Sequence, residues 1–212
     1  MTLLYRLDQV TLAQLSECGG KAARLGDALR LGAPVLPGAV LTTELYRRFM
    51  RQGGLQGEIA SILATMQPST MTHFQAAEWA IREAFHVRRI PAEVSDAVAQ
   101  AFDLLGGAPV AVRSSATNED SPQQSFVGQH ATFLRVADHA QALDAVLGCW
   151  MSLYSAKALS YAHRFRVDLL NSAMAVLLQP MIQPSLEGAL FTVEPITGDP
   201  EVFVIEVLQG PG

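Results

Sequence analysis

The chain has 212 residues, of which 50% are hydrophobic and 17% are charged, and its 15 Lys and Arg against 20 Asp and Glu give a net charge of −5. This length and composition predict a folded protein with a sizeable core and exclude a disordered chain. The mild acidity and the lack of a basic run argue against nucleic acid as a partner.

No apolar stretch approaches the roughly 18 residues that a membrane-spanning helix needs, so no membrane partner is predicted. Arg6 and Asp8 interrupt the N-terminal apolar residues before they are long enough for a signal peptide. Two cysteines are too few for a disulfide framework in a chain of this size. We therefore expect a cytoplasmic protein with reduced thiols.

Residues 1–107 are predicted to form a mostly helical lobe, in which apolar residues recur at helical spacing between Gly and Pro breakers. The predicted elements are a helix over 20–31, a strand over 39–42, a helix capped by Thr43 and ending near Gly53 and Gly54, and helices over 72–87 and 91–105.

Residues 108–212 are predicted to form a second lobe with a mixed sheet, which makes the chain an α+β protein. The expected elements are a strand over 109–112 that ends at Arg113, a loop over 114–129, a strand over 132–136, a long helix that begins at a capping box of Asp138 and Gln141 and continues to Tyr154, and strands over 173–179, 188–193 and 202–207.

The first candidate site is the sequence Cys-Gly-Gly-Lys that ends at Lys21, at the start of a predicted helix. Two glycines let the backbone approach a ligand, helix-start N–H groups attract anions, and Lys21 adds a positive charge, so the segment has what a phosphate needs. It is not a Walker A loop, because Ala22 follows the lysine. A simple turn into a helix with a solvated lysine explains the same residues.

The second candidate is Arg113, at the end of an apolar strand and followed by Ser114, Ser115, Glu119 and Asp120. A strand can hold the guanidinium rigidly against an anion, and the hydroxyls and carboxylates that follow suit polar ligand edges or a hydrated cation. The alternative is that Arg113 pairs with Glu119 or Asp120 and only fixes the loop.

Two further segments suit a nucleotide. Gly128 and Gln129 lie in a sequence that could fold over phosphates with its backbone, although a β-turn with hydrophobic anchors fits as well. The apolar strand that runs into Gln179, Pro180, Met181 and Ile182 could offer adenine a backbone donor, an acceptor and flat apolar contacts. The alternative is a buried strand that leaves the sheet at a proline.

The order of these segments is more specific than any one of them. Gly-Gly-Lys, Pro-Gly-x-Val-Leu-Thr-Thr, Val-Arg-Ser-Ser-Ala-Thr-x-Glu-Asp, Ser-Phe-x-Gly-Gln, Gln-x-Met-Ile and Phe-Thr-x-Glu-Pro-x-Thr-Gly-Asp follow one another along the chain. Together they resemble the nucleotide-binding domain of the phosphoenolpyruvate synthase, pyruvate phosphate dikinase and rifampin phosphotransferase family. The resemblance runs from about Gly19 to the C-terminus, with little contribution from residues 52–107.

This resemblance implies an ATP-grasp-like domain formed by the two lobes together. In the family, ATP is split to AMP and phosphate, and a phosphoryl group passes through a histidine on a swivelling domain to an acceptor such as pyruvate. By position, Lys21 and Arg113 would contact the ATP phosphates, Gly128 and Gln129 would belong to the loop that covers them, and residues 179–182 would line the adenine.

The sequence departs from the family pattern in several ways, among them Glu194 in place of Asp or Asn and Gly-Pro-Gly at residues 210–212 in place of Gly-Leu-Gly-Glu. None of its five histidines has the carrier context Thr-x-x-Gly-Gly-x-x-x-His, and none shows metal-ligand spacing. The carboxylate and glutamine that hold Mg²⁺ in the family would follow the last residue here. We therefore expect a fragment or a shortened relative that is inactive alone. The alternatives are a nucleotide-binding or scaffolding module without turnover and the ATP-binding part of a biosynthetic ligase.

Overall fold

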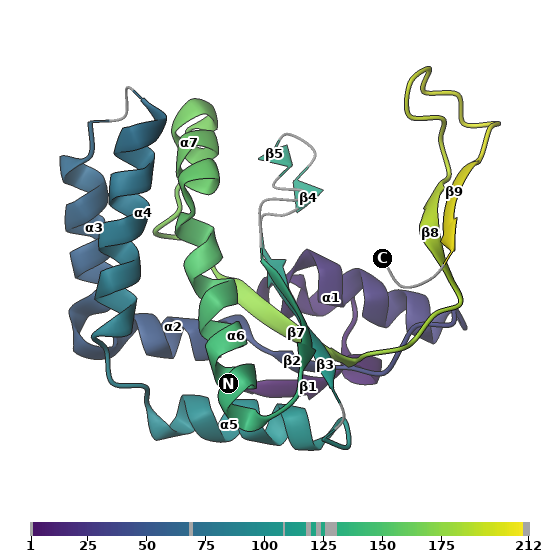
Figure 1. The fold of residues 1–212 in the computed structure, drawn as a ribbon, viewed down its shortest axis with the longest axis horizontal. Helices are drawn as coiled ribbons and strands as arrows, with labels where there is room; N and C mark the ends of the chain where they lie inside the picture. Colours follow the sequence, from purple (N-terminus) through teal and green to yellow (C-terminus); the bar gives the residue numbers. More distant parts are fainter. Residues whose placement is uncertain are drawn as a thin grey trace. The chain divides into compact units, whose positions relative to one another are not determined.

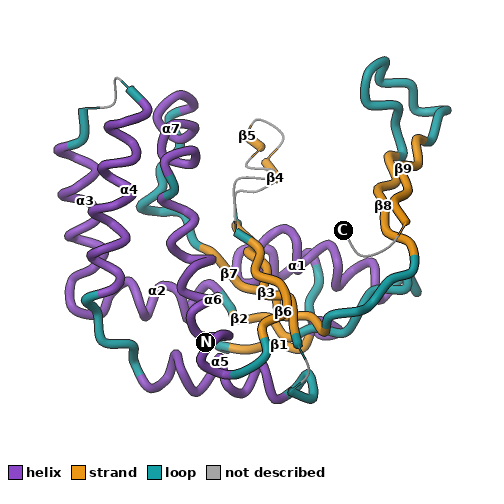
Figure 2. The backbone as a smooth tube through the Cα atoms, viewed as in Figure 1, coloured by secondary structure: helices purple, strands orange, loops and turns teal. Residues whose placement is uncertain are grey.

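The computed structural model describes residues 2–67, 70–107, 109–117, 120–121, 124–125 and 131–209. The chain divides into one compact unit over Met1–Pro180 and a second over Met181–Gly212. The first unit combines helices with an antiparallel sheet and the second holds a β-hairpin, so helices and strands occur together as predicted (Figures 1 and 2). Within the described residues, no helix has the length and apolarity needed to cross a membrane.

The first unit is built on a five-stranded sheet whose strands lie in the order β1-β2-β7-β3-β6. These strands are β1 (Leu4–Arg6), β2 (Ala39–Leu41), β3 (Val110–Ala116), β6 (Thr132–Val136) and β7 (Met174–Pro180). Each of its pairs is antiparallel, where a mixed sheet was predicted. The reason is that β7 enters between β2 and β3, which run in the same direction, and pairs antiparallel with both.

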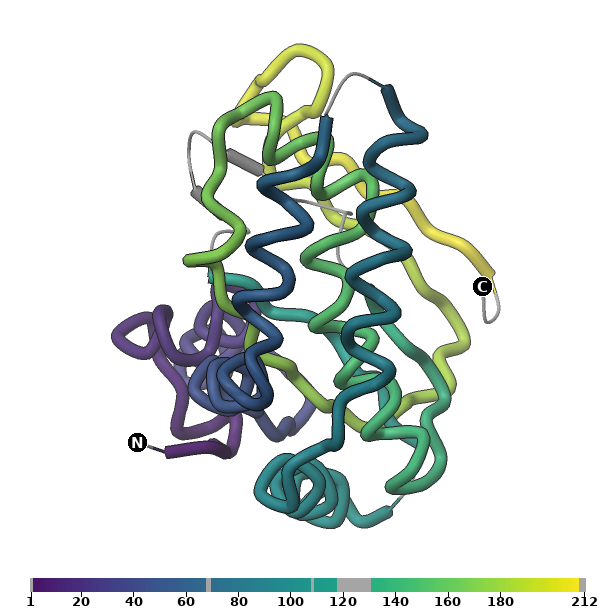
Figure 3. Tube along the Cα trace, turned by 90° about the vertical axis from the view of Figure 1, so that its left-hand side faces the viewer, coloured from purple at the N-terminus to yellow at the C-terminus, as the bar shows by residue number. Residues whose placement is uncertain are grey.

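Helices cover both faces of this sheet (Figure 1). They are α1 (Leu15–Arg30), α2 (Thr43–Arg51), α3 (Leu55–Thr65), α4 (Met71–His86), α5 (Ala92–Asp103), α6 (His139–Met151) and α7 (Ala156–Phe165), with short 3₁₀ turns at Leu7–Gln9, Leu12–Gln14, Gln52–Gly54 and Ser152–Tyr154. Side chains alternate along β7: Ala175 and Leu177 pack with Cys18 and Ala22 of α1, whereas Val176 and Leu178 face the larger core on the other side. Figure 3 shows α4 beside α3 and α7 on that second side.

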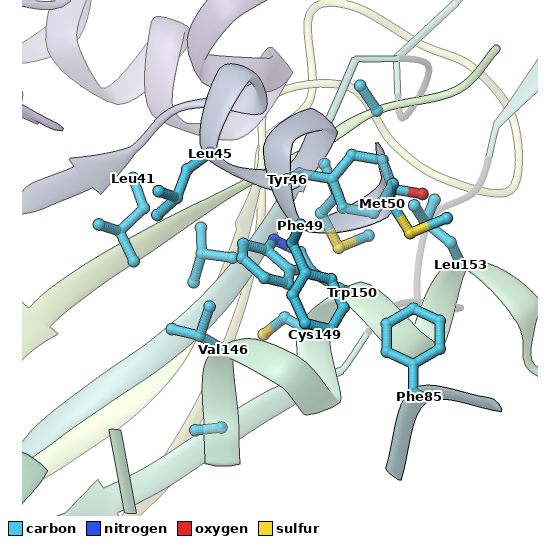
Figure 4. Packing of buried hydrophobic residues seen from close by; sticks show 14 of the residues in the cluster. Leu41, Leu45, Tyr46, Phe49, Met50, Phe85, Val146, Cys149, Trp150 and Leu153 are labelled. Carbon is cyan, nitrogen blue, oxygen red and sulfur yellow. The ribbon is translucent and has the colours of Figure 1, made fainter. Parts of the chain in front are cut away.

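The larger core is centred on the aromatic side chains of α2 and α6 (Figure 4). Trp150 is fully buried, with its ring centroid 5.3 Å from that of Phe49 and 5.8 Å from that of Tyr46. The Tyr46 hydroxyl lies 3.0 Å from the Tyr154 hydroxyl, so each of these buried polar groups has a partner. This packing joins α2 to α6 and the turn after it, and it accounts for the apolar face predicted for residues 138–154.

Several predicted elements are confirmed within two residues, among them the strands β2, β6 and β7 and the helices α4 and α5. The predicted N-cap of α6 is confirmed, because Asp138 accepts a hydrogen bond of 2.8 Å from the Gln141 backbone N–H, but the box is incomplete, because the Gln141 side-chain oxygen accepts from the Ala137 N–H and not from that of Asp138. Four predictions are wrong. Helix α1 begins at Leu15 and not at residue 20, so the Gly-Gly-Lys segment lies within it; Thr42, not Thr43, precedes α2; β3 continues through Ser114 and Ser115; and the helix expected to reach Tyr154 ends at Met151. The elements β1 and α3 were not predicted, nor were the two short strands within the predicted loop 114–129.

The second unit contains the antiparallel hairpin β8 (Leu186–Phe191) and β9 (Val204–Gln209), each displaced by two residues from its predicted position. A further two-stranded pair, β4 (Asp120–Ser121) and β5 (Gln124–Ser125), lies in the first unit. The large apolar side chains of the hairpin and the turn that joins its strands are mostly exposed: Leu186, Leu190, Phe191, Val193, Ile196, Val202, Phe203, Ile205, Val207 and Leu208.

Candidate functional site

Helix α1 is interrupted at Gly19, within the Gly-Gly-Lys segment. Gly19 has φ 74° and ψ 167°, a backbone conformation that is essentially restricted to glycine. A Cβ at this position would lie 1.9 Å from the carbonyl oxygen of Ser115 in β3, which is far inside van der Waals contact. Gly19 therefore allows the helix backbone to approach the sheet more closely than any other residue would.

Polar contacts join the residues after this kink to β3. The Ala22 backbone N–H donates to the Ser115 hydroxyl over 3.0 Å, and both residues are buried. Because Gly19 has no side chain to cap the helix that restarts after it, Ser115 supplies the capping oxygen from the sheet. The Lys21 ammonium donates to the Ser114 carbonyl oxygen over 2.7 Å. The start of this helical segment is thus fixed to the end of β3.

Arg113 lies on the same strand, one residue before Ser114. Its Nη1 donates to the Gln179 side-chain oxygen over 3.2 Å, and the Gln179 amide nitrogen donates to the Leu36 carbonyl oxygen over 3.1 Å. Gln179 is only 5% exposed, whereas Arg113 is half-buried. The alternative in which Arg113 pairs with Glu119 or Asp120 concerns two side chains that the structure does not describe.

Lys21 and Arg113 both lie where α1 packs against β3, Lys21 in contact with Ser114 and Arg113 in contact with Gln179. Residues alternate between the two faces of a strand, and Ser115 contacts α1, so Arg113 two residues earlier lies on the α1 face as well. Lys21 reaches this region from α1 and contacts the backbone next to Arg113. Two positive side chains, one on each element, make this face suitable for an anionic ligand.

Ser114, Cys18 and Cys149 lie near these two cations, and none of them offers a reactive side chain. The Ser114 hydroxyl is buried and has no hydrogen-bond partner within the described residues, so Ser114 contributes its backbone carbonyl to the site. Burial raises the pKa of the Cys149 thiol to about 12, and the positive charge of Lys21 opposes that rise. Burial raises the pKa of Cys18 to about 12 as well. Neither thiol is therefore a nucleophile at neutral pH.

The remaining predicted site residues are less well placed by the structure. Gly128 and Gln129 lie outside the described residues. Pro180 is the last residue of β7 and is half-buried. Met181 and Ile182 belong to the second unit, in which Ile182 is 54% exposed. The assignment of residues 179–182 to the adenine stays a prediction.

A separate cavity of about 470 Å³ lies between α4, α6 and β6, on the face of the sheet opposite α1. Its lining is mostly apolar, with Glu78, Arg82 and Asp144 as the charged residues. Arg82 lies 3.5 Å from the Glu78 carboxylate and offsets its charge. Asp144 adds a second negative charge, so the lining has a net negative charge. A polyphosphate would be repelled there, and the α1 face of β3 remains the better candidate. Within the described residues, no group of three or more His, Cys, Asp or Glu side chains could hold a metal ion.

Comparison with known proteins identifies the family of this chain. Residues 15–212 match the family described as "Pyruvate phosphate dikinase, AMP/ATP-binding domain". The chain is similar to a phosphoenolpyruvate synthase of Aeropyrum pernix, with 38% identity over 99% of this chain and 26% of that protein. It is also similar to a rifampicin phosphotransferase of a Streptomyces species, with 35% identity over 99% of this chain and 24% of that protein.

A third relative is the prodigiosin synthesizing transferase PigC of Serratia marcescens, with 33% identity over all of this chain and 22% of that protein. The chain thus spans about a quarter of the length of these curated relatives. The match covers nearly the whole chain, including Lys21, Arg113 and Gln179, and the predicted resemblance is confirmed. The chain belongs to the family of pyruvate phosphate dikinase AMP/ATP-binding domains.

Proposed function

We propose that this domain binds ATP with the ammonium of Lys21 and the guanidinium of Arg113 directed at the phosphates. The observation that carries the proposal is the contact of Lys21 with the backbone of Ser114, next to Arg113 on β3. Phosphoryl transfer depends on positioning the phosphates and neutralising their charge, which two fixed cations supply. The membership of an AMP/ATP-binding family supports the same ligand.

In this arrangement Lys21 exchanges one oxygen ligand for another. Its ammonium donates to the Ser114 carbonyl oxygen, and a phosphate oxygen of ATP would replace that acceptor or accept from another N–H of the same ammonium. Arg113 has five N–H donors, and among the described residues Gln179 accepts from one of them, so the rest of the guanidinium fork is proposed to bond a phosphate. Gly128 and Gln129 would form the loop over the phosphates.

The wider activity that we propose is that of a dikinase-type phosphotransferase. An ATP-grasp-like domain would split ATP to AMP and phosphate, with one phosphoryl group passing through a histidine on a swivelling domain to a small acceptor such as pyruvate. The names of the relatives support a transferase, and their variety leaves the acceptor to other parts of such proteins. The family resemblance also implies Mg²⁺, but the described residues include no group of three or more His, Cys, Asp or Glu side chains that could hold it.

Isothermal titration of the chain with ATP in the presence of magnesium tests nucleotide binding. We expect Arg113→Ala and Lys21→Ala each to weaken ATP affinity roughly 10- to 100-fold, because each removes a charge-assisted hydrogen bond to phosphate. The matched control is Arg30→Ala, which removes an exposed positive charge from the far end of α1. Absence of ATP binding by the unaltered chain would refute the nucleotide role.

Product analysis tests the phosphotransferase step separately. In a protein of this family that carries this domain and turns over ATP, we expect AMP and phosphate among the products. Formation of ADP alone would contradict the dikinase-type chemistry but not the binding of ATP. Binding without any turnover would instead favour a nucleotide-binding module, and AMP with a condensed organic product would favour a biosynthetic ligase.

A further inference from the structure

We propose that Gln179 is a positioning residue for Arg113, and that its side chain does not contact the adenine. This inference rests on the proposed function, because Arg113 is the residue that would hold the phosphates. Gln179 lies near the end of β7, in the central part of the sheet beside β3. The side chain of a buried residue at this place can fix the direction of a neighbouring arginine.

The hydrogen bonds of Gln179 determine which way its amide faces. Leu36 offers a carbonyl oxygen, which can only accept, so the amide nitrogen of Gln179 must face Leu36. The amide oxygen is then directed at Arg113, which can only donate. Both ends of the amide are therefore used, and the two contacts agree on a single orientation.

A neutral acceptor has a physical advantage over a carboxylate at this position. The Gln179 oxygen holds one N–H of Arg113 without cancelling the positive charge of the guanidinium. A carboxylate in its place would form an ion pair with Arg113 and compete with the phosphates for the same group. Glutamine therefore fixes the direction of Arg113 and preserves its charge for the ligand.

The same contacts exclude the Gln179 side chain from recognition of a base. The side chain is 5% exposed, and its oxygen and nitrogen are both bonded within the protein. An adenine beside the end of β7 would have to be bound by backbone groups and apolar contacts instead. Removal of the Gln179 amide should then weaken binding of phosphates and leave binding of the nucleoside unchanged.

Ligand-observed NMR titrations with ATP and with adenosine separate these two roles, because the method also measures weak affinities. We expect Gln179→Met, which keeps the length and removes the amide, to weaken ATP binding about tenfold while the affinity for adenosine is unchanged. Gln179→Glu should weaken ATP binding further, because the carboxylate pairs with Arg113. In the Arg113→Ala background, Gln179→Met should have no additional effect on ATP affinity.

The outcomes distinguish this inference from the proposed function. Equal losses of ATP and adenosine affinity in Gln179→Met would overturn the positioning role and assign the side chain to the base. Unchanged ATP affinity in Gln179→Met, with a loss of thermal stability alone, would also overturn it, since the contact would then serve only the fold. If the unaltered chain bound neither ligand, the proposed function itself would fail.

Discussion

The close approach of α1 to β3 makes Gly19→Ala the most informative perturbation of this fold. An alanine would have to adopt φ 74° and ψ 167°, and its Cβ would lie 1.9 Å from the Ser115 carbonyl oxygen and 2.6 Å from the Ser115 hydroxyl. Backbone strain of this kind costs about 1–3 kcal/mol. The forced separation of two packed backbones adds a similar amount, about 1–3 kcal/mol.

The expected loss is therefore about 2–6 kcal/mol, a large share of the 5–15 kcal/mol that stabilises a typical domain. In urea denaturation followed by far-UV circular dichroism, this loss corresponds to a decrease of about 1–3 M in the midpoint. The same substitution should weaken ATP binding, because moving α1 away from β3 also moves Lys21 from the Ser114 carbonyl.

Two other glycines provide matched controls. Gly32 has φ 85°, but a Cβ added at this residue would have no atom within 4 Å. Gly32→Ala therefore tests the backbone strain alone and should lower the free energy of unfolding by about 1–2 kcal/mol. Gly57 lies in α3, also with no atom within 4 Å, and Gly57→Ala should stabilise the chain by about 0.5–1 kcal/mol. If Gly19→Ala cost no more than Gly32→Ala, the argued contact between α1 and Ser115 would be refuted.

Two further predictions concern alkaline stability and the hairpin. Because burial raises the pKa of Cys149 from 9.0 to about 12, the folded chain keeps a proton that the unfolded chain releases above pH 9. The free energy of unfolding should therefore fall by about 1 kcal/mol more between pH 9 and 10 than it does in Cys149→Ala; equal slopes in urea denaturation would contradict this. An isolated two-stranded ribbon is marginally stable, so amide hydrogen exchange should be faster in 186–191 and 204–209 than in β3 and β7. Similar protection from exchange in the hairpin and in β3 and β7 would contradict this prediction and would show that other residues cover the hairpin.

The elements that could be predicted from the sequence are those with strong local signals. Asp138 and Gln141 mark the start of α6, Pro91 precedes α5, and the apolar run before Gln179 forms β7. Helix α3 was not predicted, for two reasons. It directly follows Gly53 and Gly54, and it buries only two side chains, Leu55 and Ile59, so the helical periodicity of its apolar residues is weak. Strand β1 has three residues and is a strand only because it pairs with β2.

The polar end of β3 shows how tertiary contacts override local preference. Ser114 and Ser115 follow an arginine and were predicted as a loop, yet both are buried strand residues that pair with β7. The sheet supplies their backbone partners, and the Ala22 N–H satisfies the Ser115 hydroxyl. A serine that is unfavourable in an isolated strand is thus stabilised by a helix far away in the chain.

The ordered motifs alone determined the family, and the residue types within them indicated two cations for a phosphate. The contact of Lys21 with the Ser114 carbonyl, next to Arg113, was decided by the tertiary structure: the two residues are 93 positions apart in the chain, and the packing of α1 against the sheet brings them together. The bonds of Gln179 to Arg113 and Leu36 depend on the same arrangement. Local sequence carries propensity and charge, but contacts between distant segments exist only when burial of a shared apolar face has fixed the strand order.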